Sequence, residues 1–464
     1  MKSLKLNLCA LVILPYVTNL NATPLDDAIK DIDVGGIMRY RYYLGNGDNK
    51  GGNEDRKIQY WGGIASPEYN QYHSWRTGIG ARGNIADNFK ATVHFEYLDG
   101  SNGYGDDAQA NTLRSFALKQ IYLTYSAGDT QVKMGRQYVD TIWVSPSFFK
   151  SGFAKDFYGG LIGTGIVASN TSISGLTLNA YAFDNVAWSA TGLSKGTFNG
   201  YTVYGDDGSD IQSDVGSWVA KKNLYAVSAL GSYEVAEKGK LNPQFWLGYL
   251  PNRATLYAGV LSYGVDLGEN VNYTLTGTYL GNSVDSFAKQ RQDFKNGNFF
   301  QLDGSFTYDA WDAGAGVVRY GNSKHKTFTI IEDQGSLNIP AGYNILYTNG
   351  SRLNGDVGRN TFGYITGGYS FYLPKKLRLG AEFICGGTLY ERKEGFKTYK
   401  VENGVAQEVT LIGQGGKKYE YRLTASYSYS PKLIFSIFYA NLNVNRKSEN
   451  ANVQAGRFQA FYRF

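Results

Sequence analysis

Side chains of alternating polarity run through this chain to its final residue. In the last segment, 457–464, one parity holds Phe458, Ala460, Tyr462 and Phe464, and the other holds Arg457, Gln459, Phe461 and Arg463. Successive side chains of a β-strand point to opposite faces, so a period of two is typical of strands. The sequence therefore predicts a chain that ends inside a strand.

The same period recurs in many earlier segments. In 38–44, Met38, Tyr40, Tyr42 and Leu44 oppose Arg39, Arg41 and Tyr43. The segments 91–98, 176–183 and 419–427 alternate in the same way. Apolar residues on one parity and polar residues on the other are typical of strands that lie between lipid and a wet lumen.

The chain begins with a segment of the secretory type. Residues 1–22 carry Lys2 and Lys5, then an apolar run, then small or polar residues up to Ala22. This order predicts a cleaved signal peptide. The rest has no uncharged apolar stretch near the roughly 20 residues of a membrane helix. We therefore predict one domain, 23–464: an all-β, transmembrane, antiparallel barrel in the outer membrane of a Gram-negative bacterium.

Composition agrees with a barrel. Aromatic residues make up 15% of the chain, with 38 Tyr, 58 Gly and only 9 Pro, which suits strands joined by tight turns. Removal of Lys2 and Lys5 lowers the net charge from +6 to +4, and without a basic run this predicts no nucleic-acid partner. Cys385 alone remains after cleavage, so no internal disulfide is expected.

Short turns alternate with long polar connections, as in outer-membrane barrels. At about 25 residues per strand and connection, the mature length predicts about 18 strands, with 16 possible. A soluble all-β sandwich would also alternate, but tyrosines at expected strand ends favour lipid–water boundaries: Tyr40, Tyr42, Tyr125, Tyr279, Tyr427, Tyr429 and Tyr462.

Enzyme motifs are absent. His94 and Glu96 could form half of a barrel-hydrolase site, but no nucleophile partner is identifiable, so two lumen residues are the favoured interpretation and no enzyme is predicted. The selectivity of a pore depends on charge and diameter at its constriction. The candidate residues there are the bases Arg39, Arg41, Arg82, Lys133 and Arg136 and the acids Asp140, Asp156, Glu332 and Asp333.

Segment 135–165 is the candidate constriction loop. It carries Trp143, Phe148, Phe149, Phe153, Phe157 and Tyr158. So many apolar side chains favour packing against the inner wall over full exposure, and a patch that contacts neighbouring protomers is the alternative.

Several stretches together resemble the Campylobacter major outer membrane protein family. Among them are "TPLDDAIKDIDVGGIMRYRY", "IEDQGSLN", "TNGSRLNGDVGRNTFGYITGGY", "YSPKLIFSIFYANLN" and "RFQAFYRF". The resemblance implies a homotrimeric, cation-preferring, size-limited porin whose third extracellular loop folds into the lumen. It also implies possible structural calcium held by Glu332 and Asp333 with an acid of the loop, Asp156 or Asp140. Loop 135–165 departs from the family pattern, in length and in its acids.

The resemblance also makes the end of the chain, with Phe464, Tyr462 and Phe458, a signal for the barrel-assembly machinery. Lipid and lipopolysaccharide are the expected surroundings. The leading prediction is a general porin for passive diffusion of small hydrophilic solutes and ions, with no required cofactor. The alternatives are a surface adhesin that uses loops 184–222 and 386–418, or a substrate-specific channel with an aromatic slide of Tyr43, Tyr122, Tyr181, Phe438 and Phe461.

Overall fold

A computed structural model describes most of the predicted barrel. The described residues are 32–50, 71–102, 117–144, 161–188, 203–204, 210–211, 223–286, 289, 294–331, 335–337, 339, 351, 353, 356–391, 396–402, 405–411, 415–445 and 450–464. The predicted signal peptide, 1–22, lies outside these residues and stays a prediction. No described helix is both long and apolar enough to cross a membrane.

Nineteen strands form one antiparallel sheet that closes on itself. They are β1 (Asp33–Lys50), β2 (Gln71–Ala86), β3 (Phe89–Asn102), β4 (Ala117–Ala127), β5 (Thr130–Tyr138), β6 (Leu161–Ile173), β7 (Leu176–Trp188), β10 (Leu224–Gly231), β11 (Tyr233–Val235), β12 (Gly239–Leu250), β13 (Ala254–Gly268), β14 (Val271–Val284), β15 (Asn298–Tyr308), β16 (Trp311–Thr327), β17 (Asp356–Leu373), β18 (Lys375–Leu389), β21 (Gly416–Ser428), β22 (Leu433–Asn445) and β23 (Asn450–Arg463). Two small hairpins lie outside this sheet, β8 (Val203–Tyr204) with β9 (Asp210–Ile211) and β19 (Phe396–Glu402) with β20 (Val405–Leu411).

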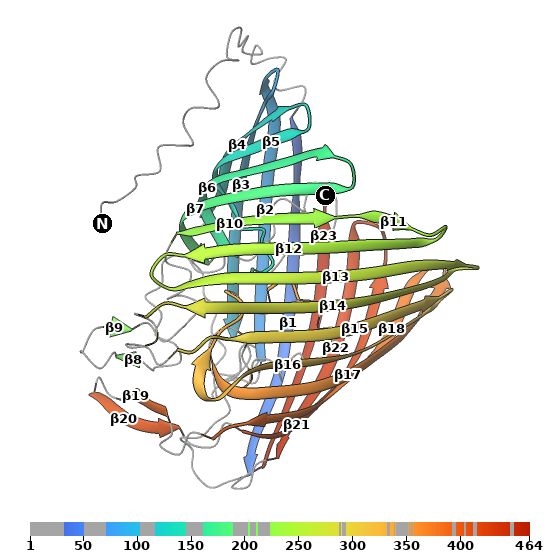
Figure 1. Ribbon diagram of the computed structural model, residues 1–464. Helices are drawn as coiled ribbons and strands as arrows, with labels where there is room; N and C mark the ends of the chain where they lie inside the picture. Colours follow the sequence, from blue (N-terminus) through green and yellow to red (C-terminus); the bar gives the residue numbers. More distant parts are fainter. Residues whose placement is uncertain are drawn as a thin grey trace.

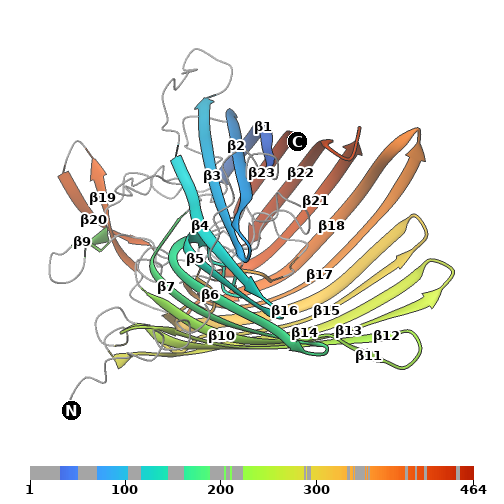
Figure 2. The same cartoon turned by 90° about the horizontal axis from the view of Figure 1, so that it is seen from above.

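The barrel has 18 strand positions, as the sequence predicted. β10 and β11 both pair with β12 and together fill one position, so the sheet is a closed 18-strand barrel. Apart from the two small hairpins, consecutive strands lie side by side, and the sheet curves round until β1 stands next to β23 (Figures 1 and 2).

Closure depends on the pairing of the first strand with the last. The register places Met38 opposite Tyr462 and Tyr42 opposite Phe458. Gly36 and Phe464 exchange two backbone hydrogen bonds, each 3.1 Å long. Because every backbone group in hydrocarbon needs a partner, this pairing removes the two free edges that an open sheet would leave.

The connections divide by length, as predicted. Between β2 and β3, β4 and β5, and β17 and β18 the turns are very short, and these turns lie at the same end of the barrel as the start of β1 and the end of β23; we call this the short-turn end. At the opposite, long-loop end, the connection 251–253 between β12 and β13 is the exception, with only three residues.

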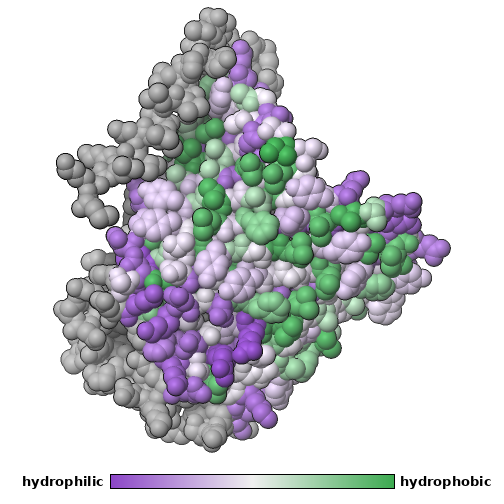
Figure 3. Space-filling view, viewed as in Figure 1, coloured by the Kyte–Doolittle hydropathy of each residue, from purple (hydrophilic) through white to green (hydrophobic). Residues whose placement is uncertain are grey.

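The alternation seen in the sequence separates an outer face from an inner face. Outer residues such as Met38, Phe245 and Leu423 are 53%, 67% and 55% exposed, whereas their inner neighbours Ile37 and Trp246 are buried or half-buried. Figure 3 shows apolar residues among residues of intermediate hydropathy across the face of β10–β16, with hydrophilic residues at the right-hand tip and in a larger group at the lower left. Apolar residues on the outer face and polar residues in the lumen are typical of a membrane β-barrel.

Candidate functional site: the lumen wall and its inward loops

Arginines gather on the inner wall where the barrel closes. Arg39 and Arg41 lie on one face of β1, and the register places Arg76 of β2 directly opposite Arg39. Arg457 of β23 lies opposite Tyr43, which is also on that face of β1. Paired residues of neighbouring strands share a face, so four guanidinium groups lie together on this part of the wall.

Among the described strands around these arginines, one carboxylate pairs with an arginine of the group. Glu96 of β3 accepts a hydrogen bond of 2.6 Å from Arg76 Nη2, and both side chains are buried. Arg41 donates from Nε to Gln459 at 2.6 Å and from Nη1 to the Tyr43 hydroxyl at 3.0 Å. The wall is therefore cationic and has its side chains fixed by neighbours.

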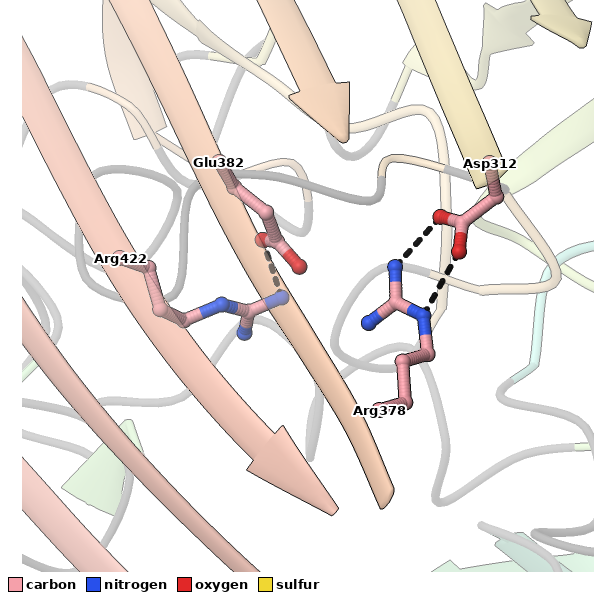
Figure 4. Close-up of polar contacts among 4 residues, drawn as sticks. All are labelled: Asp312, Arg378, Glu382 and Arg422. Carbon is pink, nitrogen blue, oxygen red and sulfur yellow. Dashed lines mark hydrogen bonds and ion pairs between the residues drawn. The ribbon is translucent and has the colours of Figure 1, made fainter. Parts of the chain in front are cut away.

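A second group of charges lies on β16, β18 and β21. Arg378 donates to both carboxylate oxygens of Asp312, at 2.8 and 2.5 Å, and Arg422 pairs with Glu382. Figure 4 shows the two pairs side by side, and each pair joins one guanidinium group to one carboxylate. These bidentate or close pairs fix side-chain positions, so they add polar surface to the lumen without a large net charge.

The wall opposite the arginines is almost free of charge among the described residues. Its inward side chains are hydroxyls, amides and aromatics, including Tyr181, Ser228, Trp246, Thr278 and Gln301. Tyr181 stacks on Trp246 with ring centroids 6.1 Å apart. A solute in the lumen would therefore pass between a cationic wall and one whose side chains are mostly neutral.

Two connections fold inward and pack against this neutral wall. Trp143, from the segment 139–144 after β5, is fully buried and lies edge-on to Trp246, with ring centroids 6.1 Å apart. Ile330 and Ile331, from the connection after β16, belong to the same buried cluster. Segment 139–144 is part of the constriction loop expected at 135–165; residues 145–160 lie outside the described part, and the constriction stays a prediction.

The two inward connections also bind each other. Ile331 donates its backbone N–H to Trp143 at 2.8 Å, and Ser336 donates its own to Ile142 at 3.0 Å. The Ser336 hydroxyl lies 3.0 Å from the Val144 carbonyl oxygen. Nothing in the sequence pattern signalled this pairing, because loop contacts leave no period.

A polar cavity of about 230 Å³ lies between these connections and the wall. Asp140 stands at its edge, exposed, and Asp303 of β15 is buried beside it with the Tyr364 hydroxyl at 2.7 Å. Thr276, Thr278, Gln244, Gln301 and Ser336 supply further polar groups. Acidic and neutral oxygens therefore face the lumen across from the arginine wall.

The predicted basic residues lie on different parts of the barrel. Arg39 and Arg41 line the lumen, and Lys133 lies on the inner face with its ammonium 5.8 Å from the Tyr122 ring centroid. Arg82 is near the short-turn end, paired with the exposed Asp33 at 3.0 Å. Arg136 pairs in register with the outward Ile121, so it lies on the outer face and away from the lumen.

The predicted acids are only partly within the described residues. Asp140 is described, but Asp156, Glu332 and Asp333 lie outside the described part, although their neighbours Ile331 and Gly335 are packed against segment 139–144. Among the residues that the structure describes, no group of three or more His, Cys, Asp or Glu could hold a metal ion.

Sequence reasoning missed part of the arginine wall. Arg76 and Glu96 carry the buried pair, and Glu96 was considered only with His94 as half of an enzyme site. Their parity was a usable signal: in 73–82, Ser74, Arg76 and Arg82 share the inner face. The aromatic residues predicted as a slide do face inward, and Tyr43, Tyr122, Tyr181 and Phe438 are buried on the wall.

At the end of β23, the predicted assembly residues lie on the outer face. Phe458, Tyr462 and Phe464 are 37%, 38% and 43% exposed, as the parity of the sequence indicated. Their recognition by an assembly machinery remains a prediction.

Comparison with known proteins found the same architecture. Residues 1–464 match the family described as Campylobacter major outer membrane protein. A search of curated proteins found no match. The structure resembles Acinetobacter baumannii OccAB4 (12% identity, 94% of this chain and 99% of that chain, TM-score 0.58) and Pseudomonas aeruginosa OccK5, or OpdH (11%, 93% and 98%, 0.57). It also resembles Pseudomonas aeruginosa OpdK, solved with vanillate (13%, 93% and 98%, 0.57). At these identities the likeness shows the fold.

Proposed function

Because the chain belongs to the Campylobacter major outer membrane protein family, we propose that it lets small hydrophilic solutes and ions diffuse passively through a constricted aqueous lumen. It is an outer-membrane porin of a Gram-negative bacterium, and its family and fold point to a channel rather than an enzyme. The observation that carries the proposal is the inward packing of 139–144 inside a closed barrel whose wall is polar and charged.

The mechanism needs no covalent chemistry. Water fills the lumen, the inward connections reduce its cross-section, and fixed charges order what passes. Arginines on β23, β1 and β2 face a mostly neutral wall that carries the acid Asp303, with Asp140 on the inward connection beside it. Opposite charges across a narrow pore create a transverse field, which orients dipolar solutes and acts most strongly where water is restricted.

We infer a mild cation preference from the acids of the inward connections. Asp140 is exposed at the lumen side, and Asp156, Glu332 and Asp333 belong to the same two connections. Lumen acids beside the restricted path raise the local cation concentration. Structural calcium, bound by Glu332 and Asp333 with Asp156, would partly cancel that charge, since calcium takes hard oxygen ligands.

Reversal potentials in a potassium chloride gradient test selectivity and calcium together. The wild-type protein should show a cation-selective potential that falls when calcium is added and recovers with a chelator. Glu332→Gln should remove the calcium response, and Asp140→Asn should shift the potential toward anions. An anion-selective potential in calcium-free buffer would overturn the cation preference, and an equal calcium response in Glu332→Gln would overturn the site.

A homotrimer is part of the proposal, supported by the family to which the chain belongs. Chemical cross-linking in outer-membrane vesicles should then trap three copies and no larger assembly. A monomer after efficient cross-linking would contradict it.

One observation favours a substrate-specific channel as a second candidate. Tyr43, Tyr122, Tyr181 and Phe438 are buried on the inner wall, where aromatic faces could guide a ring or a sugar. Liposome swelling with a series of sugars of similar size separates the two: a general porin admits them at similar rates, and a specific channel favours one.

A further inference from the structure

Arg39 is a group of the arginine wall whose hydrogen bonding is incomplete. Arg39 Nε is buried and makes no hydrogen bond, whereas Arg41 donates to Gln459 and Tyr43, and Arg76 donates to Glu96. A buried donor without an acceptor costs free energy, more so when it is charged. An added acceptor at Arg39 would therefore gain free energy.

Local charge points to an anion as that acceptor. Arg39 and Arg76 are directly opposite each other in the β1–β2 register, and Arg41 is two residues further along the same face. Like charges in directly opposed positions destabilise a sheet. Glu96 forms an ion pair with Arg76. The charges of Arg39 and Arg41 are not neutralised by this pair, so that side of the wall has excess positive charge.

The neighbouring aromatic rings favour an organic anion over an inorganic one. Phe461 lies opposite Arg39 in the β1–β23 register, Tyr43 receives the Arg41 bond, and Phe438 lies under Arg457 with 4.8 Å from the guanidinium carbon to the ring centroid. A guanidinium fork matches the two oxygens of a carboxylate. The rings offer apolar contact to a carbon body, which an inorganic anion lacks.

We propose that Arg39, with Arg41 and the rings of Tyr43 and Phe461, forms a binding subsite for the carboxylate of small organic acids on their way through the pore. This inference deepens the proposed function and depends on the pore being open. Arg457 lies opposite Tyr43, nearer the long-loop end than Arg41 and Arg39. Successive inward residues of a strand are about 7 Å apart, so a carboxylate can pass from one guanidinium to the next.

Current block by benzoate tests the subsite, with neutral benzamide as the matched probe. In planar bilayers at low potassium chloride, benzoate should reduce the wild-type current saturably, and benzamide should not. Arg39→Gln should raise the half-blocking concentration about tenfold, since a charge-assisted hydrogen bond is worth about 1.5 kcal/mol or more. Arg39→Lys keeps the charge but loses the paired donors of the guanidinium group. Its half-blocking concentration should therefore fall between those of wild type and Arg39→Gln.

Arg319→Gln is the matched control. It removes the same charge from β16, where Arg319 is exposed and pairs with the outward Phe300, and it should leave the block unchanged. If Arg39→Gln does not fold, shown by loss of heat-modifiable migration on gels, Arg39→Lys carries the test. Equal half-blocking concentrations for wild type and the Arg39 variant that folds, or no saturable block in a wild type that conducts, would overturn the subsite. A folded wild type without conductance would instead overturn the proposed function.

Discussion

At the scale of single residues, two arginine–carboxylate pairs differ in how much water reaches them. In the Arg76–Glu96 pair the side chains are 8% and 0% exposed, whereas in the Arg82–Asp33 pair they are 29% and 61% exposed. Removing one member of a buried pair leaves an uncompensated charge, whereas an exposed pair is screened by solvent. The buried arginine–carboxylate pair is therefore expected to contribute more to the stability of the barrel than the exposed pair.

Glu96→Gln should lower the free energy of unfolding by about 3–5 kcal/mol. Asp33→Asn, the matched control in the exposed pair, should change it by less than about 1 kcal/mol. Urea unfolding of the barrel in lipid vesicles, followed by tryptophan fluorescence, measures both. Equal losses of stability in the two variants would show that burial does not set the strength of these pairs.

Sequence parity was enough to place some of these residues and not others. Arg39 and Arg41 were assigned to the lumen because they alternate with aromatic residues in 38–44, and the register of β1 confirms that face. Arg136 was named without a parity argument, and it lies on the outer face. Which guanidinium pairs with which carboxylate depends on strand register, and a single strand's sequence does not contain the register.

At the scale of elements, the contact between segment 139–144 and the wall depends on the absence of a side chain on β12. A Cβ atom on Gly248 would lie 2.8 and 2.9 Å from two ring atoms of Trp143. Real Cβ atoms do not approach so closely, so the glycine makes room for the buried indole. The inward connection is thus held by shape as well as by its bonds to Ser336.

Gly248→Ala should displace Trp143 and loosen this connection, at a cost of about 1–3 kcal/mol for overpacking. Single-channel recordings should then show a changed conductance and greater open-channel noise. Gly259→Ala on β13, where an added Cβ meets nothing within 4 Å, is the control and should behave as wild type. An unchanged Gly248→Ala channel would show that Trp143 does not position the constriction.

The strands themselves were predictable, because each carries its own period of two. Trp143, one of the aromatic residues that favoured an inward loop, is buried against the wall, whereas the other aromatic residues of that argument lie outside the described part. The bonds from Ile331 and Ser336 to segment 139–144 were not predictable, since two irregular segments meet there across nearly 200 residues of chain. Short-range pattern indicates strands and turns; contacts between loops arise only once the barrel has brought them together.

At the scale of the whole molecule, closure turns an alternating sequence into a pore. Met38 and Tyr462 meet on the outer face, and Arg39 and Phe461 meet on the inner face. The terminal residues that first indicated a strand are therefore one half of the seam. With no free edge in the lipid and polar residues within, the barrel satisfies its backbone and leaves a route for water.

The most direct test is the current through a planar lipid bilayer containing the purified, folded protein. An open aqueous barrel should show a steady ohmic conductance, with current proportional to voltage at low voltage and increasing with salt concentration. Protein that migrates as a folded, heat-modifiable barrel yet gives no steady conductance would contradict it.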